Sequence, residues 1–405
     1  MPVRIASRSV WAGLLAVAAV STVHARSLRE QLGASSLTVG LAGGSAFDAL
    51  AANIADSAAR SLPSVSASAG FTYRYDRDLD TFVRTSDTLG PIFLERPETL
   101  GQGKLDVNVS FQYVQFDAFD GDSIKKLEAP DPIVFRTTDP AGNLIGFTAN
   151  RLRYGLKLQS YISAFSVTYG ILDDVDVNVL VPVTQTNLDV GVHSQQVAIA
   201  GSDGDFGRSM LAPLSGSTHG TAVGVGDIQL RLKYRLPDAG AIRSAAGLQL
   251  RLPAGDENDF HGTGSFEASP FLYASTLLRS RVEAFANAGV DLRADSVERS
   301  EARYGLGVDV DVTRRLGVVL AFLGRSEFER CADEVTFLHL TPSGPALRPL
   351  LGIDFGRKDF ADLSFGTRAV IWRDIMLFAD GIFALNDDGL RNRTVIPTVG
   401  LEGTF

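Results

Sequence analysis

The stretch from Gly224 to Leu252, G-V-G-D-I-Q-L-R-L-K-Y-R-L-P-D-A-G-A-I-R-S-A-A-G-L-Q-L-R-L, decides the fold. Between Asp227 and Leu236, apolar residues alternate with polar or charged ones. A β-strand directs successive side chains to opposite faces, whereas a helix would spread these charges around its circumference. The tetrapeptide P-D-A-G is typical of a turn, and the chain then returns as a second alternating strand. Tilted strands of about ten residues cross a bilayer, so we predict a transmembrane hairpin here.

The beginning of the chain has the pattern of a secretory signal peptide. Arg4 and Arg8 precede an apolar run from Val10 to Val20, and the tripeptide V-H-A ends at Ala25. A basic start, a short apolar run and small residues before a cleavage point are the three parts of such a signal. The apolar run is too short to span a membrane. We therefore assign residues 1–25 to a signal peptide.

The composition limits which classes of protein the chain can belong to. The 405 residues include 40 glycines, and 45% of residues are hydrophobic although no apolar run after the signal is long enough for a membrane helix. Removing Arg4 and Arg8 with the signal changes the formal net charge from −9 to −11, so we expect no nucleic-acid partner. Cys331 is the only cysteine, which excludes an intrachain disulfide.

Alternating segments recur from Lys104 to the end of the chain. We expect strands at about 104–113, 150–169, 175–183, 226–236, 241–252, 265–278, 281–292, 301–312, 317–324, 360–372, 375–385 and 394–405. Tight turns alternate with longer connections, of which the stretches of about 114–150, 190–223 and 326–359 are the longest. This alternation, with an even strand number, is typical of outer-membrane barrels. The sequence therefore predicts an all-β fold, an antiparallel transmembrane β-barrel of residues 104–405 with about twelve strands.

Residues 26–103 differ from the barrel region. Ser45 and Asp48 resemble a capping box, and apolar residues then follow at helical spacing until Pro63. A hairpin at 70–84 would raise the strand number to fourteen, which is the alternative count. The rest is too irregular to face lipid, where each backbone group needs a partner. We expect a short helical and irregular segment that serves either as a plug inside the barrel or as a periplasmic or surface segment.

Aromatic residues lie near the strand ends that we expect on the periplasmic side: Tyr169, Tyr234, Trp372 and Phe405. Such positions are typical of the aromatic girdle of outer-membrane barrels.

Four stretches carry a family resemblance. The last strand, V-I-P-T-V-G-L-E-G-T-F, ends at Phe405 and resembles the C-terminal signature by which the barrel-assembly machinery recognises its substrates. Together with the opening of the central hairpin, L-R-L-P-A-G-D-E-N-D-F-H-G-T-G-S and N-D-D-G-L-R, it resembles the phenol-degradation MetA-pathway family of Gram-negative outer-membrane barrels. The resemblance covers roughly the C-terminal two thirds of the chain. It implies a transporter of small, often hydrophobic or aromatic, molecules, and the layout is similar to fatty-acid and toluene channels with an N-terminal hatch.

We find no pattern that indicates catalysis, a metal or a cofactor. The acidic cluster of Asp256, Glu257 and Asp259 lacks the spacing of an EF-hand. The histidines at 193, 219, 261 and 339 are expected in solvated loops, and none has metal-ligand spacing. No serine and histidine are placed as a nucleophile and its base. We therefore expect a protein that is not an enzyme.

Charged residues on the polar strand faces are the candidate site. Lysine or arginine facing lipid near the bilayer midplane costs about 2–4 kcal/mol, so these residues are expected to face the lumen. They are Asp227, Arg231, Lys233, Arg235, Arg251, Glu283, Asp291, Arg303, Asp309, Asp311, Arg368 and Glu402. Mixed charges of this kind either set the selectivity of a channel or form ion pairs that only hold the wall. Barrels of about eight strands are already filled by side chains, so twelve strands leave room for a lined and partly obstructed lumen.

The predicted function is passive passage of small molecules across the bacterial outer membrane, with the lipid bilayer, a solute and the assembly machinery as partners. Two alternatives stay open at this point. One is a barrel hydrolase of the outer membrane, and the other is a structural or adhesive barrel without transport.

Overall fold

The structure is a computed structural model, and the residues that it describes are 26–37, 52, 54–60, 64–67, 71–76, 81–84, 86, 88–128, 131–138, 141, 144–200, 207–295, 297–328, 336–341, 343–349 and 357–405. The predicted signal peptide, the start of the predicted helix near Ser45, and Cys331 lie outside these residues.

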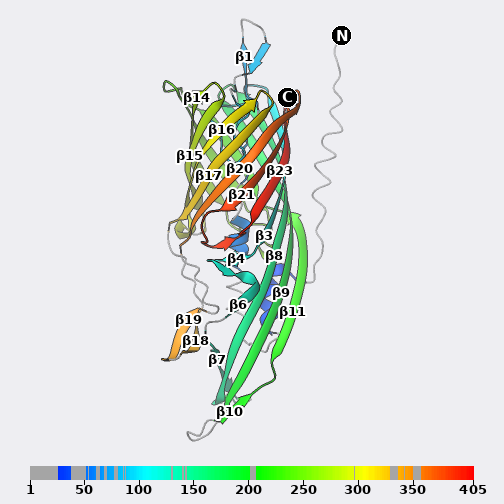
Figure 1. Ribbon diagram of the computed structural model, residues 1–405, viewed down its shortest axis with the longest axis vertical. Helices are drawn as coiled ribbons and strands as arrows, with labels where there is room; N and C mark the ends of the chain where they lie inside the picture. The colour runs from blue at the N-terminus through cyan, green and yellow to red at the C-terminus, as the bar shows by residue number, and fades with distance from the viewer. Residues whose placement is uncertain are drawn as a thin grey trace.

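The described strands form a closed antiparallel barrel of twelve wall strands (Figure 1). In order around the wall they are β3 (Leu105–Phe116), β8 (Leu144–Leu172), β9 (Val175–Ala200), β11 (Leu214–Val225) continued by β12 (Ile228–Arg235), β13 (Ile242–Leu252), β14 (Glu267–Arg279), β15 (Val282–Arg293), β16 (Glu301–Thr313), β17 (Leu316–Glu327), β20 (Asp359–Trp372), β21 (Ile375–Ala384) and β23 (Val395–Thr404). The barrel closes where β23 pairs with β3. The predicted fold class and the count of twelve are confirmed.

β11 and β12 count as one wall strand because both pair with β9. Val225 lies opposite Val183 and Gln229 opposite Leu180, so the β11–β12 chain has one extra residue, a β-bulge at Gly226 and Asp227. Glycine is needed here because a Cβ at Gly226 would lie 2.9 Å from the Pro182 ring.

The alternative count of fourteen is wrong, because the segment proposed for the additional hairpin does not join the barrel. β1 (Tyr73–Asp76) and β2 (Thr81–Arg84) pair only with each other, and Figure 1 shows β1 beyond the upper end of the barrel. That end carries the tight turns, including those at 173–174 and 373–374, and we call it the turn end and its opposite the loop end.

Alternation of side chains separates the two faces of the wall. In β12, Gln229 and Lys233 are buried, whereas Leu232 and Tyr234 between and beyond them are exposed. The four predicted girdle residues, Tyr169, Tyr234, Trp372 and Phe405, are all exposed near the turn end. The wall therefore presents apolar side chains outward and mainly polar ones inward.

Three wall strands extend far beyond the others at the loop end (Figure 1). β8 has 29 residues and β9 has 26, and β11 pairs with the distal part of β9. At about 3.3 Å per residue, β8 is about 95 Å long, well above what crossing a bilayer requires. The prediction of loops at about 114–150 and 190–223 is therefore wrong over most of these stretches, because polar residues there alternate on the outer face of a long sheet rather than leave the sheet.

The remaining short elements lie mostly at the loop end (Figure 1). They are β4 (Ala118–Phe119), β5 (Asp122–Ser123), β6 (Leu127–Glu128), β7 (Ile133–Thr138), β10 (Gly207–Met210), β18 (Thr336–Thr341), β19 (Gly344–Pro349), β22 (Leu390–Arg391) and the 3₁₀ turns η2 (Ile124–Lys126), η3 (Glu257–Asp259) and η4 (Val297–Arg299). The hairpin of β18 and β19 occupies part of the predicted loop at 326–359, so that prediction is only partly right.

The N-terminal segment packs against the inside of the wall. α2 (Leu28–Leu37) contacts β9, β11 and η3 near the loop end, and residues 54–60 are helical, as the sequence predicted for the end of its helix. Residues 64–67 and 88–100 are almost entirely buried. Every helix within the described ranges is too short or too polar to cross a membrane.

Candidate lumen site

Backbone groups of residues 88–100 form hydrogen bonds with charged side chains of the wall. The amide of Gly90 donates to the carboxylate of Asp309 at 2.5 Å, and the amide of Leu100 donates to that of Asp176 at 2.9 Å. The ammonium of Lys233 donates to the carbonyl of Glu98 at 2.7 Å. These bonds satisfy backbone groups that the irregular segment leaves without a secondary-structure partner.

Six of the twelve predicted charged residues contact this segment. Arg231 and Lys233 bind residues 64–65 and 95–98, and Glu283 accepts from the hydroxyl of Thr88 at 2.7 Å. The others are Asp309 with Gly90, Asp311 with Leu89, and Arg368 with the carbonyls of both. Spacing along each strand predicted their common face, but a single sequence gives no sign of which segment they meet.

The other six predicted residues pair with the wall or with the loops. Arg251 pairs with Glu267 at 3.2 Å, Arg303 with Asp291 at 2.5 Å, and Glu402 with Arg368. Arg235 forms an ion pair with Asp238 of the adjacent turn at 2.9 Å. Asp227 accepts hydrogen bonds from Gly255 and Thr263, which holds the loop between β13 and β14 against the bulge.

Part of the inner face is apolar, which the sequence reading did not anticipate. Met376, Phe378 and Ile382 of β21 are buried on the inner face, where they join clusters that include Leu89 or Ile92 from the N-terminal segment. The signal was present in the sequence: β21 reads I-M-L-F-A-D-G-I-F-A, and a strand that is apolar on both faces is typical of one covered on both sides.

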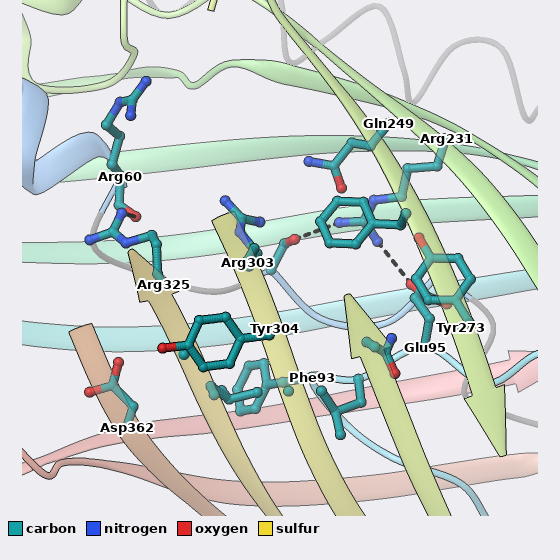
Figure 2. A pocket seen from close by; sticks show the side chains of 17 residues that line it. Arg60, Phe93, Glu95, Arg231, Gln249, Tyr273, Arg303, Tyr304, Arg325 and Asp362 are labelled. Atoms are coloured by element: carbon teal, nitrogen blue, oxygen red, sulfur yellow. Dashed lines mark hydrogen bonds and ion pairs between the residues drawn. The ribbon is translucent and has the colours of Figure 1, made fainter. Parts of the chain in front are cut away.

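A cavity of about 110 Å³ lies between the N-terminal segment and the wall (Figure 2). Arg60, Ser64 and residues 93–95 line it from the segment. The wall contributes Arg231, Gln249, Phe271, Tyr273, Asn287, Arg303, Tyr304, Gly305, Leu323, Gly324, Arg325 and Asp362. The cavity thus combines several guanidinium groups with aromatic rings and two side-chain amides.

Ion pairs fix most of the guanidinium groups at this cavity. Arg231 lies 3.5 Å from Glu95, and Arg325 lies 3.6 Å from Glu301 and 3.9 Å over the Phe360 ring. Arg60 pairs with Glu267 and lies 3.8 Å from Glu301. The lining side chains comprise four arginines but only two carboxylates. The surface facing the cavity is therefore richer in positive than in negative groups.

A second cavity of about 100 Å³ is lined by Ala58, Ala59, Ser64 and Val65 of the segment, and Ser64 lines both cavities. Its lining is more apolar and includes Val114, Leu180 and Phe260. Toward the loop end, Leu28 and Leu32 of α2 join a large apolar cluster on the extended strands. The N-terminal segment therefore separates a guanidinium-rich side of the lumen from an apolar side.

Three of the histidine predictions are wrong about location, and one is wrong about solvation. His193 lies in β9, His219 in β11 and His339 in β18, so all three are on strands. His261 lies in the loop between β13 and β14 but is buried against Gly224, so it is not solvated. Burial lowers the pKa of His261, although Asp259 and Asp256 oppose the shift.

Comparisons with known proteins give similarities of fold. No protein-family model and no curated protein matches the sequence. The chain is similar to an outer-membrane channel from Pseudomonas putida F1, with 10% identity, 76% of this chain and 97% of the other covered, and a TM-score of 0.45. It is also similar to the NanC porin, with 8% identity, 74% and 98% covered, and a TM-score of 0.37. A third similar structure is the toluene transporter TbuX of Ralstonia pickettii, with 10% identity, 75% and 90% covered, and a TM-score of 0.33.

Proposed function

We propose that the chain is a barrel of the bacterial outer membrane that lets small molecules, including hydrophobic or aromatic ones, pass down their concentration gradient. The family resemblance of the four C-terminal stretches suggests this class of solute. The single observation that carries the proposal is the arrangement of the wall: exposed apolar side chains outside, and a charged lumen with a cavity inside.

The outer surface supports a bilayer as the first partner. Leu272 and Leu306, near the middle of β14 and β16, are each 62% exposed, and Phe365 of β20 is 51% exposed. Water-soluble monomers rarely expose a continuous apolar band that encircles the molecule. Aromatic residues at the turn end suit the interface between hydrocarbon and water, and the tight turns there favour a periplasmic location for that end.

Residues 26–103 act in this proposal as a plug. Their buried part obstructs the lumen, and its hydrogen bonds to wall side chains hold it there. The twelve charged residues would then have two tasks, to anchor the plug and to line the space beside it. Solute would pass when the segment shifts, since residues 58–60 and 64–65 line one or both of the two cavities.

Two further parts of the proposal come from the sequence. Phe405 would be the contact for the assembly machinery, because the last strand resembles its recognition signature. Transport would be passive, since the sequence contains no nucleotide-binding or energy-coupling motif, and we assign no enzymatic role.

Uptake of solutes by lipid vesicles tests the function. The folded chain, checked by its heat-dependent mobility on a denaturing gel, is reconstituted and mixed with arabinose or with the tetrasaccharide stachyose. We expect swelling in arabinose that is faster than that of empty vesicles, and little swelling in stachyose. Correctly folded protein that admits neither solute would contradict an aqueous route and favour a structural or adhesive barrel.

A further inference from the structure

One row of residues crosses the wall beside the guanidinium-rich cavity. In register across neighbouring strands lie Gly247, Phe271, Gly289, Arg303, Arg325 and Phe360. Strand spacing of about 4.8 Å places Phe271 and Arg303 about 10 Å apart, with Gly289 between them. The row therefore sets an aromatic ring beside a guanidinium group, with no side chain between.

The glycines of the row determine how the rings lie. A Cβ at Gly289 would overlap the ring of Phe271, and one at Gly247 would overlap that of Tyr273, so each ring lies over a glycine of the adjacent strand. Phe271 and Tyr273 are stacked, with ring centroids 5.9 Å apart and an angle of 9° between planes. Rings that lie flat along the wall present a face to the cavity, where a planar group can stack.

Arg303 is the least occupied guanidinium of the cavity. All of its contacts with described residues, to Asp291 and Glu301, run through Nη2. Its side chain is 27% exposed, whereas that of Arg60 is 9% and that of Arg231 is 10% exposed. The donors on Nε and Nη1 therefore have no partner among the described residues, and a charged N–H donor is suited to a carboxylate oxygen. Both two-donor edges of a guanidinium include Nη2, so Arg303 offers single hydrogen bonds from these atoms rather than a bidentate pair.

A polar atom near the same row lacks a partner among the described residues. Nε of Arg231 is a buried donor and forms no hydrogen bond there. A buried donor without a partner costs free energy, which a bound carboxylate can relieve. The volume of about 110 Å³ is smaller than the about 150 Å³ of an engineered apolar cavity, in another protein, that admits benzene. The cavity therefore has room for no more than one small ring.

We propose that this cavity binds a small aromatic monocarboxylate, with the ring stacked on Phe271 and Tyr273 and one carboxylate oxygen accepting a hydrogen bond from Nη1 of Arg303. The inference deepens the proposed function and rests on it, because the cavity would be a binding site along the path that the solute takes through the barrel. It adds a negative charge to the class of molecule that the family resemblance suggests.

Calorimetric titration of the folded chain in detergent micelles tests the inference. The probes are sodium benzoate, its neutral counterpart benzyl alcohol, and sodium acetate. We expect benzoate to bind at least tenfold more tightly than either of the others. Equal affinity for benzoate and benzyl alcohol, or no benzoate binding at all, would overturn the assignment of an anion.

Variants locate the site. Arg303→Gln together with Asp291→Asn keeps the buried charges balanced, and it should weaken benzoate binding at least tenfold. Phe271→Leu, which changes no charge, should weaken benzoate binding severalfold. This variant provides the test of the site if the double variant does not fold. Arg243→Gln is the matched control, since Arg243 also faces inward beside buried acids, at 2.6 Å from Glu98, but does not line the cavity. Binding that is unchanged in both site variants would refute the location.

The outcome can be separated from that of the proposed function. If the vesicles admit arabinose but the chain does not bind benzoate, only the proposed substrate class is refuted. Benzoate binding without solute uptake would support the binding site and contradict transport.

Discussion

The ammonium of Lys233 donates a hydrogen bond of 2.7 Å to the backbone carbonyl of Glu98 and another of 3.1 Å to that of Arg96. Lys233 belongs to the alternating strand that predicts the fold, and Glu98 to the segment that fills the lumen. The charged face of β12 therefore also holds the segment in place through hydrogen bonds. Asp176, 3.9 Å away and buried, shares the same ammonium.

Replacing Lys233 by methionine should release residues 96–98. Two charge-assisted hydrogen bonds are lost, and Asp176 loses a neighbouring cation, so we expect a loss of about 2–4 kcal/mol in the free energy of unfolding. Denaturant titration in detergent measures it, and limited proteolysis should cut the segment sooner. Lys157→Met is the control, because Lys157 and Asp189 are exposed and 3.7 Å apart, and it should change stability by less than about 1 kcal/mol. Equal effects of the two changes would show that Lys233 does not anchor the segment.

Arg368 and Glu402 should be strongly coupled. Both are buried, and Arg368 also donates to the carbonyl of Leu89 at 2.6 Å. Arg368→Gln alone leaves a buried carboxylate without its cation and should cost about 3–5 kcal/mol of unfolding free energy. The double variant Arg368→Gln/Glu402→Gln should cost less than the sum of the single changes. A double-mutant cycle that proves additive within about 0.5 kcal/mol would contradict this coupling.

Arginine on the outer face should lower the free energy of unfolding only where that face lies inside the membrane. Leu306→Arg near the middle of β16 should reduce the free energy of unfolding in lipid bilayers by about 2–4 kcal/mol. Leu347 of the β18–β19 hairpin is 69% exposed and lies beyond the barrel at the loop end. Leu347→Arg should therefore change the free energy of unfolding by less than about 0.5 kcal/mol. Similar small effects at both positions would argue against a bilayer around the wall.

Acid should weaken the packing of the loop between β13 and β14. Burial lowers the pKa of His261 in the folded chain, so the unfolded chain takes up the proton at a higher pH. The stabilisation from neutral His261 is complete above the ordinary pKa of about 6.5 and is lost as pH falls below it. We expect the free energy of unfolding to decline more steeply below that pH in the natural chain than in His261→Asn. His193→Asn, which changes an exposed histidine, should keep the natural pH dependence, and a natural slope in His261→Asn would refute the role of His261.

Alternation predicts the wall well because the physical cause is local. Each residue of β12 faces either the outer surface or the lumen, so Leu232 and Lys233 reveal their environments without knowledge of any other strand. Alternation also predicts an inner face for the twelve charged residues, of which nine are buried. It missed the extended ends of β8, β9 and β11. There the pattern is reversed, with polar residues such as Arg153 outward and apolar ones such as Leu152 and Val190 inward, and the frequent polar residues and glycines resemble a loop.

Contacts between distant segments could not be predicted from one sequence. That Gly90 meets Asp309, or that Phe271, Gly289 and Arg303 form one row, depends on the register of several strands and on the path of an irregular segment. The apolar patch around Phe378 was readable in principle, because an inward phenylalanine in a charged lumen needs an apolar cover.

Single-channel conductance in a planar bilayer tests the central claim, that residues 26–103 obstruct a lumen that otherwise conducts. The chain with and without this segment is compared, after heat-dependent gel mobility has verified that both are folded. We expect small or intermittent currents for the chain with the segment and a larger, steady current when the segment is deleted. Folded barrels that conduct equally, or not at all, in both forms would contradict it.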